Sequence, residues 1–590
     1  MSRFPRMGNV LMMVMMTSGA AACGGSTPPG PATGSGDAAF AKLAADILED
    51  GYFRYPTQAT YLGIHKYDDK LEDYSRASVE DAVATARKFR SALAATDPAA
   101  LSPDKQLDRE FLSHVLGSRI IQLDVIKPWA NDPDTYSSGI TNTAYIMIKR
   151  SFAPPEERLR KLIVREKAML TVLDEARKNL QNPPEIYTKI AIEQLDGSRD
   201  MFKTAVPMAF DGVKDAALLA EFKKANNAVI VALDAYKVWL EKDLLPRSKG
   251  DFAYGADVYH QRLVADEMID TPLDELLAIA EADLKKNQAA FIETAKKIDP
   301  AKPAMAVLDA LQADHPPASK LLATTQAELD SLAKFMSDHH IVTVPQAATA
   351  RVQETPPFMR ATTFASMDTP GPFEKSATEA YYSMTLPEPK WPAAEQAEFM
   401  KQWYYAAITN VSVHEVWPGH YLQFLYAKDF PSDARKVFSA NSNAEGWAHY
   451  AEQMVIDEGF HADQPKYRLA QIQDALLRNA RFIVGIKMHT QGMTMAQAEA
   501  FFQKEGYQPG PVARAETKRG TSDATYGYYT MGKLMIIKLR EDYRAKMGAA
   551  YSLQGFHDAF IKLGPLPLPL VRRAMLGDTG SGLFSTETHR

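Results

Sequence analysis

The feature that most constrains this chain is a pair of histidines, His414 and His420, six residues apart, with Glu415 directly after the first. Residues four apart on an α-helix are separated by about 40° around the axis, whereas residues six apart are separated by about 240°. A continuous helix would therefore point the two imidazoles in different directions. Pro418 removes a backbone donor, and Gly419 tolerates unusual dihedral angles. We predict that the helix is interrupted there. His420 would then lie where a ligand four residues after His414 would lie on a continuous helix.

These residue types suit a catalytic zinc ion. Neutral imidazole nitrogens are common ligands of Zn²⁺, and a glutamate next to a ligand can take a proton from a metal-bound water. A lone histidine on an amphipathic helix is usually a packing or surface residue, but this combination favours a metal site. We therefore predict that His414 and His420 bind Zn²⁺ and that Glu415 is the general base.

The motif belongs to a set of segments that together are specific for one protein family, although each segment alone is a weak signal. They are HEVWPGHYLQ at 414–423, EGWAHYAE at 445–452, YTMGK at 529–533, ETPPFMR at 354–360 and EAYYSMTLP at 379–387. From about residue 40 to near the C-terminus, the chain resembles the bacterial lipoprotein family called domain of unknown function 885. That family resembles the gluzincin metallopeptidases, which are largely helical and hold zinc with two histidines and a glutamate.

The resemblance implies that Glu445 is the third zinc ligand, which leaves a fourth position open for water. On a continuous helix Glu445, His449 and Glu452 lie at roughly 0°, 40° and 340°, on one face. We expect Glu452 to hold one of the ligand histidines by its other nitrogen. His449 stands where the family usually has an apolar residue, and is either a second such partner or an alternative ligand. Tyr421 stands where many members have a second histidine, which favours His420 as the ligand.

Amide hydrolysis also requires a group that stabilises the developing oxyanion. Tyr529 best matches the family's Tyr-x-x-Gly pattern, and Tyr528 is the alternative, although tyrosines of this kind also pack in cores. Arg519 is a candidate clamp for a substrate carboxylate, and a solvated arginine is the simpler interpretation. Tyr382 lies in a predicted strand at 381–384 that, as an edge strand, would pair with the substrate backbone. A plain structural strand fits the same residues equally well.

The N-terminus predicts export. Arg3 and Arg6, an apolar run at 10–16 and small residues before Cys23 form the pattern of a signal peptide over 1–22. Cys23 is the only cysteine of the chain. We predict that it is lipidated and that residues 23–38 form a flexible tether, with plain secretion as the alternative. No disulfide can then form within the chain, and we expect no contact with the membrane beyond the lipid anchor.

We predict a mainly α fold, with a helical region over 39–339 and a zinc-binding, gluzincin-like region with a small sheet over 340–590. Helical periodicity is clear at 78–95, 156–179, 215–240 and 272–298. We predict a long loop at 129–141. The predicted strands lie at 341–344, 350–353 and 380–385.

The motif and the export signal predict a zinc-dependent peptidase outside the cytoplasm, in the periplasm or at the cell surface. The helical architecture of the family that the chain resembles implies that its substrates are short peptides. The net charge of −6, with both signs interspersed, argues against nucleic acid as a partner. Two alternatives stay open. One is another zinc amide hydrolase, acting on cell-wall or unusual peptides, and the other is a binding lipoprotein without catalysis. The oligomeric state is not predicted.

Overall fold

The computed structural model describes residues 34–345, 350–355, 364–577 and 582–584. The predicted signal peptide, Cys23 and most of the predicted tether lie outside these ranges. The last two residues predicted as tether, Asp37 and Ala38, already belong to the first helix, α1 (Asp37–Arg54). Within the described part of the chain, no helix is long and apolar enough to cross a membrane.

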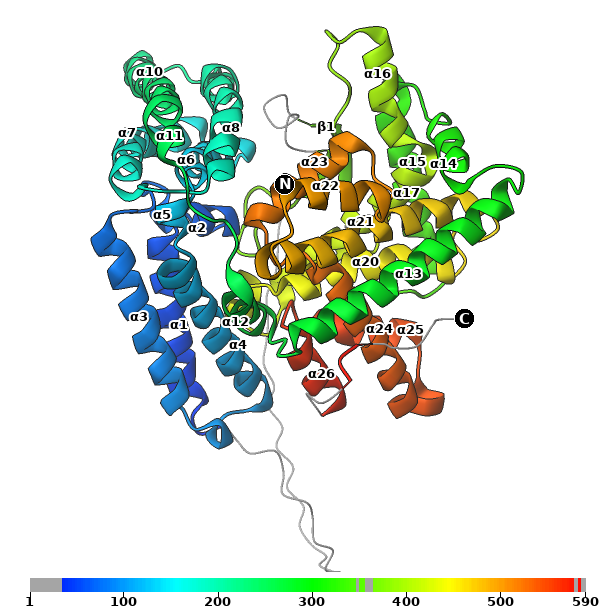
Figure 1. Cartoon of the computed structure of the whole chain (residues 1–590). Coiled ribbons are helices and arrows are strands. Elements are labelled where there is room, and N and C mark those ends of the chain that lie inside the picture. The colour runs from blue at the N-terminus through cyan, green and yellow to red at the C-terminus, as the bar shows by residue number, and fades with distance from the viewer. Residues whose placement is uncertain (1–33, 346–349, 356–363, 578–581, 585–590) are drawn as a thin grey trace, which may run out of the picture.

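The N-terminal part consists of two groups of helices (Figure 1). The first group is α1 with α2 (Pro56–Leu62), α3 (Arg76–Ala95) and α4 (Pro103–Ile120). The second is α6 (Asp134–Lys149), α7 (Pro155–Asn179), α8 (Glu185–Lys203) and α10 (Ala216–Trp239). The second group encloses its own hydrophobic core, which includes Tyr136, Phe202 and Tyr236.

All four predicted helical stretches are confirmed, with ends that agree within two residues. The start of α10 shows why, because the Asp215 side chain accepts the backbone N–H of Leu218 at 3.0 Å and caps the helix. The predicted loop at 129–141 is wrong, since α5 (Pro128–Asn131) and α6 occupy it. Buried apolar residues at helical spacing, such as Ile140 and Ala144, pack α6 into the core despite the glycine and serines nearby.

The C-terminal part is built around two pairs of closely packed helices. In the first pair α13 (Leu273–Ile298) packs along α21 (Pro465–Thr490), and in the second α20 (Asn441–Asp457) packs along α24 (Tyr528–Met547). One large hydrophobic core joins these helices. Helices on both sides of the division that we predict between residues 339 and 340 therefore share one core.

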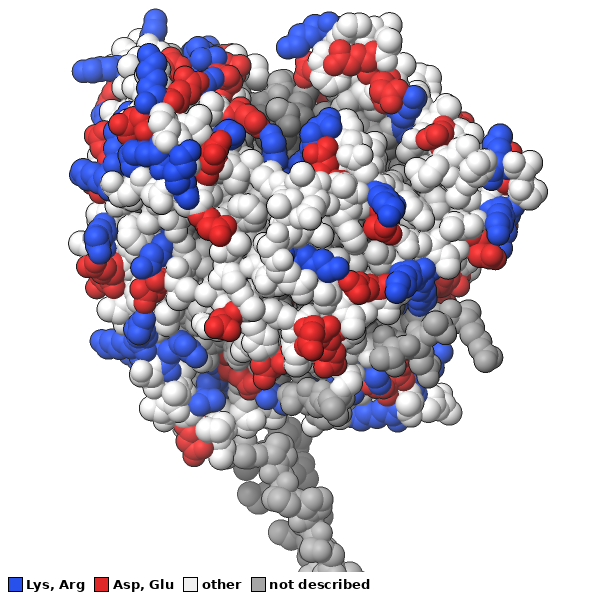
Figure 2. Space-filling view, viewed as in Figure 1, with Lys and Arg blue, Asp and Glu red and all other residues white. Residues whose placement is uncertain are grey.

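Further helices complete this part and carry the loops between the pairs. They are α12 (Gly255–Glu267), α14 (Ala304–Gln312), α15 (Leu321–Asp338), α16 (Ala393–Met400), α17 (Tyr405–Glu415), α18 (His420–Tyr426), α19 (Asp433–Val437), α22 (Met495–Lys504), α23 (Gly510–Ser522), α25 (Leu553–Lys562) and α26 (Leu568–Leu576). Two short helices, α9 (Ala205–Met208) and α11 (Leu245–Arg247), belong with the second N-terminal group. On the face drawn in Figure 2, basic and acidic side chains are interspersed.

The described sheet has three strands in the order β1-β3-β2, with β1 (Ala350–Glu354) parallel and β2 (Ala365–Asp368) antiparallel to β3 (Ala380–Met384). The predicted strands at 350–353 and 380–385 are confirmed, and β2 was not predicted. The predicted strand at 341–344 is wrong. Ile341 and Val342 are buried in the main core, and the backbone N–H of Thr343 donates to the Asp558 carboxylate instead of a strand. A mainly α fold with a small sheet is thus confirmed.

Candidate metal centre

A sharp turn between α17 and α18 brings the two motif histidines together. The predicted interruption is confirmed, since α17 ends at Glu415 and α18 begins at His420. Gly419 is required in the turn because a Cβ atom there would lie 1.8 Å from the backbone oxygen of His414. The indole N–H of Trp447, on α20, donates to the backbone oxygen before Gly419 at 2.7 Å and holds the turn against that helix.

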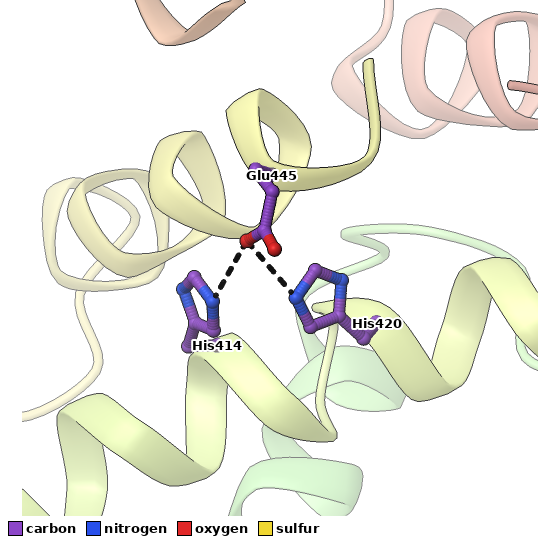
Figure 3. Close-up of side chains that lie close together, drawn as sticks. All are labelled: His414, His420 and Glu445. Carbon is purple, nitrogen blue, oxygen red and sulfur yellow. Dashed lines mark ion pairs between the residues drawn. The ribbon is translucent and has the colours of Figure 1, made fainter. Parts of the chain in front are cut away.

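Glu445, near the start of α20, points its carboxylate at both rings (Figure 3). Its Oε2 atom lies 3.4 Å from Nε2 of His414 and 3.3 Å from Nε2 of His420. The two imidazoles are nearly perpendicular, with their centroids 4.8 Å apart. One potential ligand atom from each of the three side chains lies within 4.8 Å of the others, and the structure assembles no second group of this kind from the residues it describes.

These three residues fit a divalent cation. Oε2 of Glu445 is buried and makes no hydrogen bond, although two imidazole nitrogens face it. A buried carboxylate oxygen without a hydrogen-bond partner is costly, and a cation between the three side chains would remove that cost. Two nitrogens and one carboxylate are a ligand set that catalytic Zn²⁺ uses, with one position left for water.

The outer nitrogen of His414 is held by a buried ionic network. Its Nδ1 lies 2.7 Å from Oε1 of Glu452, so the expected contact between these residues is present. Arg478, on α21, lies 2.8 Å from the same oxygen, and Nδ1 of His449 lies 3.1 Å from the other. His449 thus contacts Glu452 and is not part of the group of three. Burial and the charge of Lys533 lower the pKa of His449 to about 3, so its ring is neutral.

The carboxylates remain charged even though they are buried. Burial would raise the pKa of Glu445, but the two histidines hold it well below its usual range. Burial would likewise lower the pKa of His414, but Glu445 and Glu452 raise it to about 9. A proton on His414 therefore balances these charges in the metal-free chain, and a metal ion would displace it.

Glu415 lies between the metal centre and the sheet. Its Oε2 accepts the backbone N–H of Met367, in β2, at 3.1 Å. Because β2 is an edge strand, its outer side faces the residue that we expect to be the general base. Contrary to the expectation from the sequence, Tyr382 does not lie in a strand that could pair with the substrate backbone. It belongs to the central strand β3, which is paired on both sides, and its side chain is fully buried, so the expectation of an edge strand at 381–384 is wrong.

Tyr528, Tyr529 and Arg519 form one cluster beside the histidines. The ring of Tyr529 lies 6.4 Å from that of His414, centroid to centroid. Arg519 donates to the hydroxyls of Tyr528 at 3.2 Å and Tyr529 at 3.4 Å, and is itself held by Asp523 at 2.9 Å. Burial and the negative charge of Glu445 raise the pKa of Tyr529, so its hydroxyl keeps its proton.

Sequence reasoning missed two arginines of α21. Arg478 joins the Glu452 network, and Arg481 lies over the ring of Tyr529 at 5.0 Å while pairing with Glu516 at 2.7 Å. Their signal in the sequence is two arginines within the apolar run ALLRNARFIVGI at 475–486. Because long charged residues are almost never fully buried without a partner, such a run indicates buried acidic partners elsewhere in the chain.

Comparison with known proteins supports the fold and the family. None of the curated proteins matches the chain. A solved structure from Shewanella oneidensis, described as a "putative lipoprotein of unknown function", is 25% identical with a TM-score of 0.77, covering 91% of this chain and 99% of that one. Another, a "putative lipoprotein" from Colwellia psychrerythraea, is 17% identical with a TM-score of 0.77, covering 91% and 98%, and shows the fold alone. The family described as "Bacterial protein of unknown function (DUF885)" matches residues 56–575, so the chain belongs to the DUF885 family.

Proposed function

We propose that this protein is a zinc-dependent peptidase that hydrolyses short peptides. The observation that carries the proposal is the buried Oε2 of Glu445, which makes no hydrogen bond and faces Nε2 of both His414 and His420. Zn²⁺ held by these three side chains would supply a Lewis acid and an acidified water. Glu415 next to the first ligand adds the base that a purely structural zinc site does not need.

The side chains of the site divide the remaining work. Glu415 takes a proton from the attacking water and returns it to the leaving amine. The protonated hydroxyl of Tyr529 donates a hydrogen bond to the oxyanion, and Arg519 holds that hydroxyl in place. Glu452 and Arg478 fix the ring orientation of His414 from its outer nitrogen.

The edge of β2 is the place where we expect the peptide backbone to bind. In the absence of substrate, the outward N–H of Met367 is occupied by Glu415. An extended peptide that adds to this edge would lie along the base, with its scissile carbonyl directed at the metal centre. The side chains of His414 and His420 are only 9% and 14% exposed, and this burial favours short peptides over folded proteins as substrates.

We also propose that the chain is exported and anchored through Cys23. This rests on the signal-peptide pattern and on the description of both structural relatives as lipoproteins. Palmitate labelling of cells, compared with a Cys23→Ser variant, tests the anchor. Label that is retained in the variant would refute it.

The metal content of purified residues 24–590 tests the proposed function first. We expect about one zinc per chain by elemental mass spectrometry, and loss of that zinc in His420→Ala. Cleavage of a peptide library should then disappear in Glu415→Gln while zinc and peptide binding persist. Peptide binding without turnover by the zinc-loaded wild type would favour a binding lipoprotein, and cleavage confined to peptides with D-residues would favour a cell-wall amidase.

A further inference from the structure

A largely apolar cavity of about 210 Å³ lies beside the metal centre. Three segments of its wall come directly from the site. Phe424, one helical turn after His420 on α18, lines it, as does Ala444, which precedes Glu445. Thr369, the residue after β2, forms a third wall. The cavity therefore adjoins two of the three potential metal ligands and the end of the edge strand.

The position of Phe424 indicates that the cavity opens toward the site. Its ring lies 6.1 Å from the ring of His420, with the two planes inclined by 26°. Its exposed fraction of 40% is high for a large apolar side chain. An exposed aromatic ring next to a metal ligand is a surface that an apolar group of a bound molecule can cover.

The rest of the wall is largely apolar, and the two cations within it, Arg435 and Lys436, are both paired, Lys436 with the Asp433 carboxylate at 3.3 Å. Tyr61 and Leu62 of α2 line the cavity from the N-terminal part, and Phe438 lines it from the segment after α19. Arg435 is fully buried, and its guanidinium is bound by Asp108 at 2.7 Å. A ligand in this cavity thus meets hydrocarbon and aromatic surface, with no free charge from that arginine.

We propose that this cavity is the specificity pocket for an apolar side chain, branched aliphatic or aromatic, of the peptide residue next to the scissile bond. The assignment rests on the proposed peptidase function. An extended peptide on the edge of β2 would present alternate side chains to the same face, and we expect one of them to enter the cavity that Thr369 and Phe424 line. The substrates are then short peptides with a residue such as leucine or phenylalanine at that position.

A second cavity lies next to the first and shares part of its wall. It has a volume of about 370 Å³ and shares Gln58, Leu62, Val437 and Phe438 with the apolar cavity. Its walls add further aromatic residues of α1 and the following segment, including Tyr52 and Tyr55.

The pocket is tested by binding and by cleavage of the peptides Ala-Ala-X-Ala-Ala, in which X is glycine, leucine, phenylalanine or aspartate. Binding is measured by calorimetry on the zinc-loaded Glu415→Gln variant, which does not turn the peptides over. Burial of one leucine or phenylalanine side chain should tighten binding on the order of ten- to hundredfold over glycine. Ala427→Trp fills the cavity from its wall and should abolish this preference. Ala289→Trp, at an exposed position of α13, is the matched control that should retain it.

The results separate the pocket from the peptidase. Equal affinity for all four peptides, or an unchanged leucine preference in Ala427→Trp, would overturn the pocket even if the wild type cleaves peptides. A leucine preference in binding that Ala427→Trp removes, combined with no turnover by the wild type, would support the pocket and refute the peptidase. When the wild type does cleave, mapped cleavage sites should place X at a fixed distance from the scissile bond.

Discussion

Gly532→Ala tests how closely the helix of the metal ligand is packed. A Cβ atom on Gly532, in α24, would lie 1.9 Å from the backbone oxygen of Ser442 and 2.7 Å from Cα of Gly446, both in α20. The first contact is about 1.5 Å shorter than the 3.4 Å at which ordinary van der Waals contact begins. Because both contacts are with backbone, the helices must separate, and Glu445, next to Gly446, moves with α20.

The cost follows from two opposing effects. Overpacking of a core destabilises by roughly 1–3 kcal/mol, and replacing a helix-interior glycine by alanine returns about 1 kcal/mol. We therefore expect Gly532→Ala to lower the free energy of unfolding by about 1 kcal/mol, and by at most about 2 kcal/mol. Ligand distances at a zinc site tolerate shifts of only about 0.2 Å, so zinc affinity should fall roughly tenfold or more.

Denaturant unfolding and zinc titration on the same samples measure both effects, and Gly197→Ala is the control. Gly197 lies within α8, and a Cβ atom there would meet nothing within 4 Å. The control should be more stable than the wild type by up to about 1 kcal/mol, with unchanged zinc affinity. If Gly532→Ala behaves like Gly197→Ala, the close contact between α20 and α24 does not exist as described.

Three further predictions concern buried carboxylates. Glu452→Gln leaves the buried guanidinium of Arg478 without its anion and should weaken zinc binding roughly 10–100-fold, measured by competition with a chelator. Glu267 accepts the first two backbone N–H groups of α20, and burial raises its pKa to about 7. The folded state therefore binds the extra proton, and the free energy of unfolding falls by roughly 3 kcal/mol as the pH rises from about 4.5 to 7. Glu267→Gln should flatten this part of the pH profile of Tm, and an unaltered slope would contradict the assignment. Both carboxylate oxygens of Glu166 are buried without a partner, and burial raises its pKa to about 9. Glu166→Met should therefore stabilise the fold by roughly 1–3 kcal/mol, and a lower Tm would show that the carboxyl has a partner.

The parts of the site that depend on local sequence could be predicted. The turn at Pro418 and Gly419 follows from backbone chemistry, because proline lacks a donor and only glycine leaves room beside the carbonyl of His414. The common face of Glu445 and Glu452 follows from helical periodicity. Which carboxylate lies against which histidine nitrogen follows only from the family resemblance, since both acidic residues lie on that face.

The contacts that join distant segments could not be predicted from one sequence. Arg478 reaches Glu452 only because α21 packs beside α20, and no local pattern specifies that pairing. The same holds for the contact between Met367 and Glu415, because the strand of Met367 is only four residues long and the sequence pattern does not predict it. The predicted strand at 341–344 is wrong because its local pattern suits a strand while its surroundings do not. Its apolar residues suit a sheet, but they pack into a helical core that offers no strand to pair with.

The unusual spacing of the histidines makes the whole site depend on α20. In a continuous helix, two ligands four residues apart are aligned by the helix itself. Here the alignment depends on the turn between His414 and His420, which Trp447 holds through the backbone oxygen of Pro418. The same helix also supplies Glu445 to the metal side of His414 and Glu452 to its outer nitrogen. Docking of α20 therefore sets the third ligand, the turn and the ring orientation together, which explains why so many of its residues are buried, polar ones included.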